Sequence, residues 1–201
     1  MGRDNHMVWG RAAWRPRPGR RRFPRMSDKQ PEVWLRGPVP GVPALLQPAA
    51  HALLQAKEDV ARLLPGLRSE ALGARPGGAA SIAYHVRHAA GSLDRLYTYA
   101  RGSELSSEQR ATLVAEARLS EEPVPAQELV ALFEAAVDRA LTQLRETPEE
   151  SLLEAREVGR KKLPATVLGL LFHGAEHTVR HAGQVATTVK VQTGGDGAAP
   201  A

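Results

Sequence analysis

Prolines and glycines divide this chain of 201 residues into four long stretches with the apolar periodicity of amphipathic helices. The breaks fall at the proline-rich segment 31–43, at Pro65-Gly66, at the R-P-G-G sequence of 75–78 and at Thr147-Pro148. The four stretches between them cover residues 44–64, 80–101, 127–146 and 164–192. Because proline fits only the first turn of a helix, these positions predict helix boundaries.

The connections between these helices are longer than those of a simple up-and-down bundle. A short extra helix is predicted at 107–118, and residues 151–163 are expected to be irregular. The sequence has no strand-like alternation, so it predicts an all-α fold, a four-helix bundle with long irregular connections. With 42% hydrophobic residues the chain can bury one core. We therefore expect one helical domain at 31–192 and a flexible tail at 193–201.

The positive charge is concentrated ahead of the helical domain. Residues 1–25 contain eight arginines and one acidic residue, a charge of +7, whereas the whole chain carries +5 and its remainder therefore −2. We expect residues 1–30 to be a disordered basic leader. Three interpretations stay open: an arm for nucleic acid or a membrane surface, a targeting peptide, or upstream sequence ahead of a true start at Met26. Nucleic-acid binding is disfavoured because the domain itself is slightly negative.

Composition excludes several classes of site. The chain has no cysteine, which rules out disulfides, thiolate zinc sites, iron–sulfur clusters and a cysteine nucleophile. No stretch approaches the roughly 18 apolar residues that a membrane helix needs. Both observations fit a cytoplasmic protein that does not contact membranes.

Five of the seven histidines fall in two clusters. His85 and His88 lie in the second helical stretch, whereas His173, His177 and His181 follow one another at four-residue spacing in the last. Residues four apart lie on the same face of a helix, so two imidazoles one turn apart can reach a single ion. Imidazole is a common ligand of zinc and its neighbours. The clusters therefore predict a divalent metal held between two helices.

Helical wheels show that these histidines differ in how close they lie to the apolar face of their helix. His181 and then His177 lie closest to the apolar arc of the last helix, whereas His173 lies almost opposite. In the earlier helix, periodicity places His85 nearer the core than His88. The wheels thus favour His177 and His181 as one pair and leave the first ligand open between the other two. A lone histidine pair would more often be a surface feature than a metal site.

Other polar residues near the histidines carry weaker signals. Gln184 is either a hydrogen-bonding partner of a ligand or a helix-packing residue. Tyr84 or Tyr99 can supply a proton, but no pattern identifies a catalytic residue. The remaining charges are most simply solvated: Asp94, Arg95, Glu176 and Arg180.

The two histidine segments together resemble the DinB-like (DinB/YfiT) family. The segments are S-I-A-Y-H-V-R-H-A-A-G-S at 81–92 and H-T-V-R-H-A-G-Q at 177–184, and H-x-x-x-H-x-G-Q is the most specific element. The resemblance covers most of residues 40–192 and implies a metal-binding four-helix bundle, commonly a homodimer. The family's first ligand is a histidine followed by small residues, which implies His88 with His177 and His181. The extra histidines, the proline-rich segment and the arginine leader depart from the family pattern.

Three neutral imidazoles leave a metal ion with an open coordination position, as in catalytic sites. The resemblance implies a metal-dependent transferase, with a low-molecular-weight thiol as candidate cosubstrate, or a hydrolase acting on a small molecule. Zinc and nickel are the ions we expect first. The alternative is a non-catalytic, metal-stabilised stress-response dimer.

Overall fold

The computed structural model describes residues 30–120 and 122–194, and its helical unit starts at Glu32. The predicted leader, the start at Met26 and the tail beyond residue 194 lie outside the described residues.

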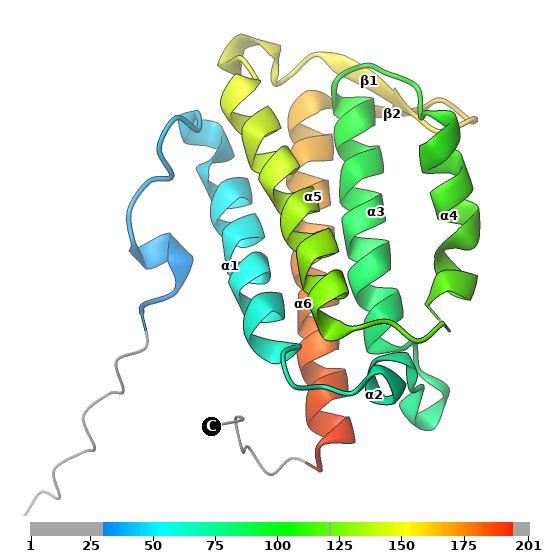
Figure 1. Cartoon of the computed structure of the whole chain (residues 1–201). Coiled ribbons are helices and arrows are strands. Elements are labelled where there is room, and N and C mark those ends of the chain that lie inside the picture. The colour runs from blue at the N-terminus through cyan, green and yellow to red at the C-terminus, as the bar shows by residue number, and fades with distance from the viewer. Residues whose placement is uncertain (1–29, 121, 195–201) are drawn as a thin grey trace, which may run out of the picture. The chain divides into compact units, whose positions relative to one another are not determined.

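Four long helices form the bundle that the sequence predicts, and the all-α class is confirmed. They are α1 (Gln47–Leu63), α3 (Ile82–Ala100), α5 (Ala126–Glu146) and α6 (Val167–Gln192). Helix α3 packs most extensively on α6, and α1 packs on both α6 and α5 (Figure 1). Helices α3 and α6 run antiparallel, so the start of one lies beside the end of the other.

Short elements fill the connections. Helix α4 (Ser107–Leu119) is the predicted extra helix and lies against α3 (Figure 1). Helix α2 (Ser69–Gly73) was not predicted. Single 3-10 turns occupy four more positions: Val33–Leu35, Ala44–Leu46, Pro76–Gly78 and Glu149–Ser151.

The segment before α6 corrects one prediction. Instead of being irregular, it contains an antiparallel hairpin of β1 (Ala155–Val158) and β2 (Leu163–Thr166). Pro164 does not open the last helix, because it lies in β2 opposite Glu157. A two-stranded sheet has only edge strands, which tolerate a residue without an N–H. The helix begins where the Thr166 hydroxyl accepts a hydrogen bond from the Gly169 N–H and caps it.

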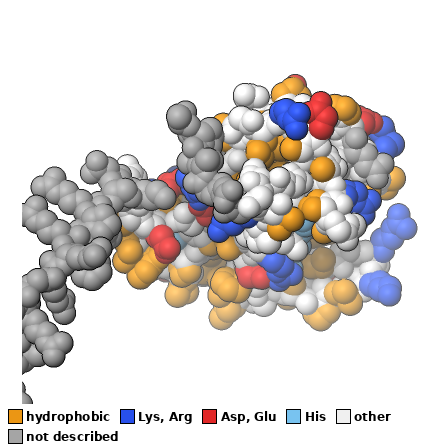
Figure 2. Space-filling model, turned by 90° about the horizontal axis from the view of Figure 1, so that it is seen from below, with side chains coloured by type: hydrophobic (Ala, Val, Ile, Leu, Met, Phe, Trp, Pro, Cys, Tyr) orange, Lys and Arg blue, Asp and Glu red, His pale blue; other side chains and the backbone are white. Residues whose placement is uncertain are grey.

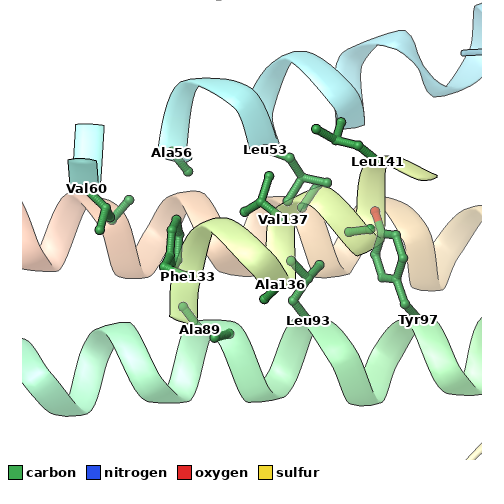
Figure 3. Packing of buried hydrophobic residues seen from close by; sticks show 14 of the residues in the cluster. Leu53, Ala56, Val60, Ala89, Leu93, Tyr97, Phe133, Ala136, Val137 and Leu141 are labelled. Atoms are coloured by element: carbon green, nitrogen blue, oxygen red, sulfur yellow. The ribbon is translucent and has the colours of Figure 1, made fainter. Parts of the chain in front are cut away.

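The core lies between the four helices. Phe133 of α5 is almost fully buried and reaches between α1 and α3, where Val60 and Ala89 lie close to it (Figure 3). Leu53 and Leu93 extend the same apolar layer along the bundle. These positions recur at helical spacing on their helices, and this spacing is the apolar periodicity from which the four helices were predicted.

Helices α3 and α6 approach closely at Gly174. A Cβ atom at this position would lie 2.8 Å from Tyr97 Cε2 and 3.3 Å from Leu93 Cδ1. The Tyr97 hydroxyl crosses to α6 and donates a hydrogen bond of 3.2 Å to the Leu171 carbonyl. This tight contact fixes the position of α3 along the axis of α6. Gly174 lies about one turn before His177.

Figure 2 shows the unit from the end at which α6 finishes. Hydrophobic side chains are interspersed there with Lys, Arg, Asp and Glu rather than gathered into one continuous area. Within the described residues, no helix combines the length and the apolar character needed to cross a membrane.

The α3–α6 contact generates a stability prediction. Gly174→Ala should lower the free energy of unfolding by about 1–2 kcal/mol, because overpacking against Tyr97 outweighs the better helix propensity of alanine. Gly183→Ala is the matched control on the same helix, since nothing lies within 4 Å of its Cβ position. It should raise stability by about 0.5–1 kcal/mol. Urea denaturation of both variants measures the difference, and equal effects would contradict the close contact.

Candidate metal centre

Three of the five clustered histidines come together between α3 and α6. His88 of α3 and His177 and His181 of α6 each offer one ligand nitrogen, and these nitrogens lie within 4.8 Å of one another. The ring centroid of His88 lies 5.3 Å from that of His177 and 4.8 Å from that of His181. The two α6 rings are neighbours because their residues are one turn apart. This is the trio that the family resemblance implied.

The His88 ring is oriented by a carboxylate. Its Nδ1 lies 2.9 Å from Oε2 of Glu116, which belongs to α4. An ionised carboxylate can only accept, so Nδ1 carries the proton and donates. The Nε2 atom of His88 is left with a free lone pair, as metal binding requires.

The His177 ring is oriented by a hydroxyl. Its Nδ1 lies 3.2 Å from Ser92 Oγ, and that hydroxyl donates its own proton to the Ala89 carbonyl at 3.2 Å. When the hydroxyl donates in this way it accepts from the ring, and Nδ1 of His177 then carries the proton. Its Nε2 is again the nitrogen with a free lone pair.

The His181 ring is paired with a fourth histidine. Nδ1 of His181 lies 3.1 Å from Nδ1 of His85, which is buried behind it on α3. One of the two nitrogens donates to the other; when His181 donates, its Nε2 is available beside the other two. His85 thus lies nearer the core, as the wheel indicated, but it contacts a member of the trio rather than joining it.

Burial favours the neutral form of three of these imidazoles, those of His85, His177 and His181. Burial, reinforced by His177, lowers the pKa of His181 to about 4. Burial also lowers the pKa of His85 and of His177. Only a neutral imidazole has a lone pair to give to an ion, so this shift favours metal binding by the two histidines of α6.

His173 lies apart, as the wheel predicted. Its side chain is about half exposed, and its Nδ1 lies 3.4 Å from Glu176 Oε2. Its ring centroid is nevertheless 5.7 Å from that of His177. His173 also lines an open, mainly apolar hollow of about 720 Å³ that Leu96, Leu163 and Leu170 help to form. His173 thus lines this hollow on one side and lies beside His177 on the other.

The structure contradicts one expectation about the neighbouring polar residues and decides against one alternative for another. Arg95 is not solvated: it is buried and donates to Glu116 Oε1 at 2.5 Å. Of the two alternatives for Gln184, the structure shows no hydrogen bond to a ligand: its side chain is exposed and forms no hydrogen bond with another described residue. It lies on the exposed side of α6.

Of the two tyrosines, one lies at the site. The Tyr84 ring stacks on that of His88 with centroids 5.4 Å apart and an interplanar angle of 5°. Tyr99 packs against the apolar core instead.

Sequence reasoning missed the partners of the rings. Glu116 lies in the weakly amphipathic helix α4, and nothing in its local pattern indicates that it reaches α3. Ser92 is the end of the S-I-A-Y-H-V-R-H-A-A-G-S segment and lies one turn after His88. That spacing placed it on the histidine face, which was a usable signal.

The fold and the trio define a class: a helical bundle with an open cluster of three histidines on two facing helices. The sequence model of the DinB superfamily matches residues 52–185. This chain belongs to the DinB superfamily.

A solved structure supports the fold. The crystal structure of a conserved protein from Enterococcus faecalis is similar to this chain, with a TM-score of 0.58 and 22% sequence identity. The match covers 74% of this chain and 97% of the other. No curated protein matches the sequence.

The buried neutral histidines generate a pH prediction for metal-free protein. Unfolded histidines have a pKa near 6.5 and take up protons first as the pH falls, whereas folded His181 resists protonation down to about pH 4. The free energy of unfolding should therefore decrease from pH 6.5 to pH 4.5, by on the order of 1–3 kcal/mol. Urea denaturation of chelator-treated protein at several pH values measures this.

Between pH 6.5 and pH 4.5 the effect of the histidines can be distinguished from that of Glu116. Burial raises the pKa of Glu116, but hydrogen bonds from His88 and Arg95 outweigh burial and hold it below its usual value of 4.5. Its stabilising contribution is therefore lost only at lower pH. A His181→Gln variant should show a smaller decrease than the wild type between pH 6.5 and 4.5. Stability that is independent of pH in the wild type would contradict the prediction.

Proposed function

We propose that His88, His177 and His181 hold one divalent metal ion through their Nε2 atoms. The observation that carries this proposal is the engagement of all three Nδ1 atoms, by Glu116, Ser92 and His85. Outer partners of this kind fix ring orientation and tautomer in metal sites. Zinc and nickel both suit imidazole ligands. Three protein ligands leave at least one position for a substrate.

We further propose a metal-dependent transferase or hydrolase that acts on a small molecule, with a low-molecular-weight thiol as cosubstrate in the transferase case. A bound divalent ion would act there as a Lewis acid that activates water or a thiol and polarises a substrate group. The protein's own contributions are binding and proton handling. The hollow beside His173 offers apolar surface for part of a substrate, and Tyr84 places a phenol next to His88.

A homodimer and a cytoplasmic location belong to the same proposal. Large apolar side chains remain exposed on and before the bundle helices, among them Leu45, Phe172 and Val179. A second copy of the chain would cover such side chains, and the cysteine-free composition suits a reducing compartment.

Metal content tests the proposed centre. The wild type, purified without a histidine tag, should contain one zinc or nickel ion per chain. His177→Ala should lose that ion, because two imidazoles remain where three are needed. His173→Ala is the matched control on the same helix and should keep full occupancy, since its ring lies outside the trio. Elemental analysis makes the measurement, and full occupancy in His177→Ala would contradict the assignment.

Turnover separates the enzyme from its non-catalytic alternative. Zinc- or nickel-loaded protein should consume a small electrophile in the presence of a low-molecular-weight thiol, or hydrolyse a small ester. His177→Ala should reduce that rate by a factor of 100 or more, because the three-ligand site is lost. Spectrophotometric assays measure the rates. If chelation lowers the melting temperature but no thiol or ester supports turnover, the metal-stabilised dimer is the better description.

A further inference from the structure

Helix α4 has no apolar anchor. Helices in bundles are usually held by a buried apolar face, but the one buried side chain of α4 is that of Glu116. Two of its three large apolar residues point outward, Val114 at 85% and Leu113 at 45% exposure, and the third, Leu119, is only partly buried. The attachment of α4 to α3 must therefore depend mainly on polar contacts.

Two side chains of α4 make those contacts. Near its start, Gln109 Nε2 donates to Asp94 Oδ2 at 2.6 Å and to Thr98 Oγ1 at 2.8 Å. Near its end, the Glu116 carboxylate accepts from Arg95 with one oxygen and from His88 with the other. The second contact is buried, and it links α4 directly to a member of the histidine trio.

The fold leaves room for this carboxylate at Gly91. A Cβ atom there would lie 2.4 Å from Glu116 Oε1 and 2.8 Å from Arg95 Nη1. Any larger residue would therefore displace the pair. Glycine is unfavourable inside a helix, so its place at this point of α3 is explained by the close approach of Glu116.

We propose that Glu116 is a positioning residue of the metal centre and that metal binding and the docking of α4 stabilise each other. The inference rests on the proposed ion at His88, His177 and His181. A carboxylate that accepts from Nδ1–H makes Nε2 a better electron donor, and an ion on Nε2 makes Nδ1–H a better hydrogen-bond donor. By linkage, whatever strengthens one contact strengthens the other to the same extent.

The first test is the zinc affinity of full-length variants, measured by competition with a chromophoric chelator. Glu116→Gln should weaken zinc binding by about 10–100-fold, because it keeps the shape of the side chain but removes its charge. Gly91→Ala should weaken binding in the same direction, although it touches no ligand and favours the helix. Glu108→Gln, an exposed charge change on the same helix, should leave affinity within threefold of the wild type.

The second test is hydrogen exchange in residues 107–119. In the wild type, zinc should slow exchange across α4, whereas in Glu116→Gln it should slow exchange near the histidines but not in α4. A merely structural role of Glu116 would change folding without this loss of zinc response. Circular dichroism confirms that each variant is folded, and Gly91→Ala serves if Glu116→Gln is not.

The outcomes separate the two proposals. If the wild type binds no zinc, the metal centre itself is wrong. If the wild type binds zinc and both Glu116→Gln and Gly91→Ala bind it equally well, the positioning role is wrong. If affinity falls but zinc never changes exchange in α4, the coupling is wrong. Weaker zinc binding in both variants together with zinc-dependent protection of α4 in the wild type supports the inference.

Discussion

The close packing of α3 on α6 is the contact on which the rest of the structure depends. It brings together residues from opposite parts of the chain: the Tyr97 hydroxyl reaches the Leu171 carbonyl, and Gly174 lets the two helices approach. The same pair of helices supplies all three members of the histidine trio and two of their partners. The geometry of the site therefore follows from how closely α3 and α6 pack. That packing is set by side chains that cannot bind a metal.

The sequence predicts the helices well because their apolar periodicity is strong and because proline and glycine mark their ends. It fails at 151–163, where Pro164 looks like a helix start but lies in an edge strand, and where the Thr166 cap decides the boundary. For the histidines, too, periodicity predicts one property and misses another. Periodicity correctly separates the buried His85 from the less buried His88, but burial alone does not reveal which nitrogens converge. That information lies in the relative rotation of two helices, and the family pattern supplied it.

The partners of the rings were the least predictable part. Glu116 is one of many acidic residues, and its helix has little amphipathic character, so no local signal separates it from a solvated charge. Arg95 was misjudged for the same reason: its buried charge is paired with Glu116, which belongs to a distant part of the sequence. The burial of each member of such a pair depends on the other. Neither residue can therefore be recognised as buried from its own sequence neighbourhood. Gly91 is the one trace that the pair leaves in the sequence, as a helix-weakening residue within a good helix.

The distance along the chain between the two histidine segments has a consequence for biosynthesis. Ser92 and His177 are separated by 85 residues, and His85 and His181 by 96. During translation α1, α3, α4 and α5 all leave the ribosome before the helix that carries two of the three histidines. A nascent chain thus contains only one member of the trio, His88, until α6 emerges and docks. Loading of the proposed ion would then be a late event that follows the docking of α6, because a chain truncated before α6 lacks two of the three proposed ligands.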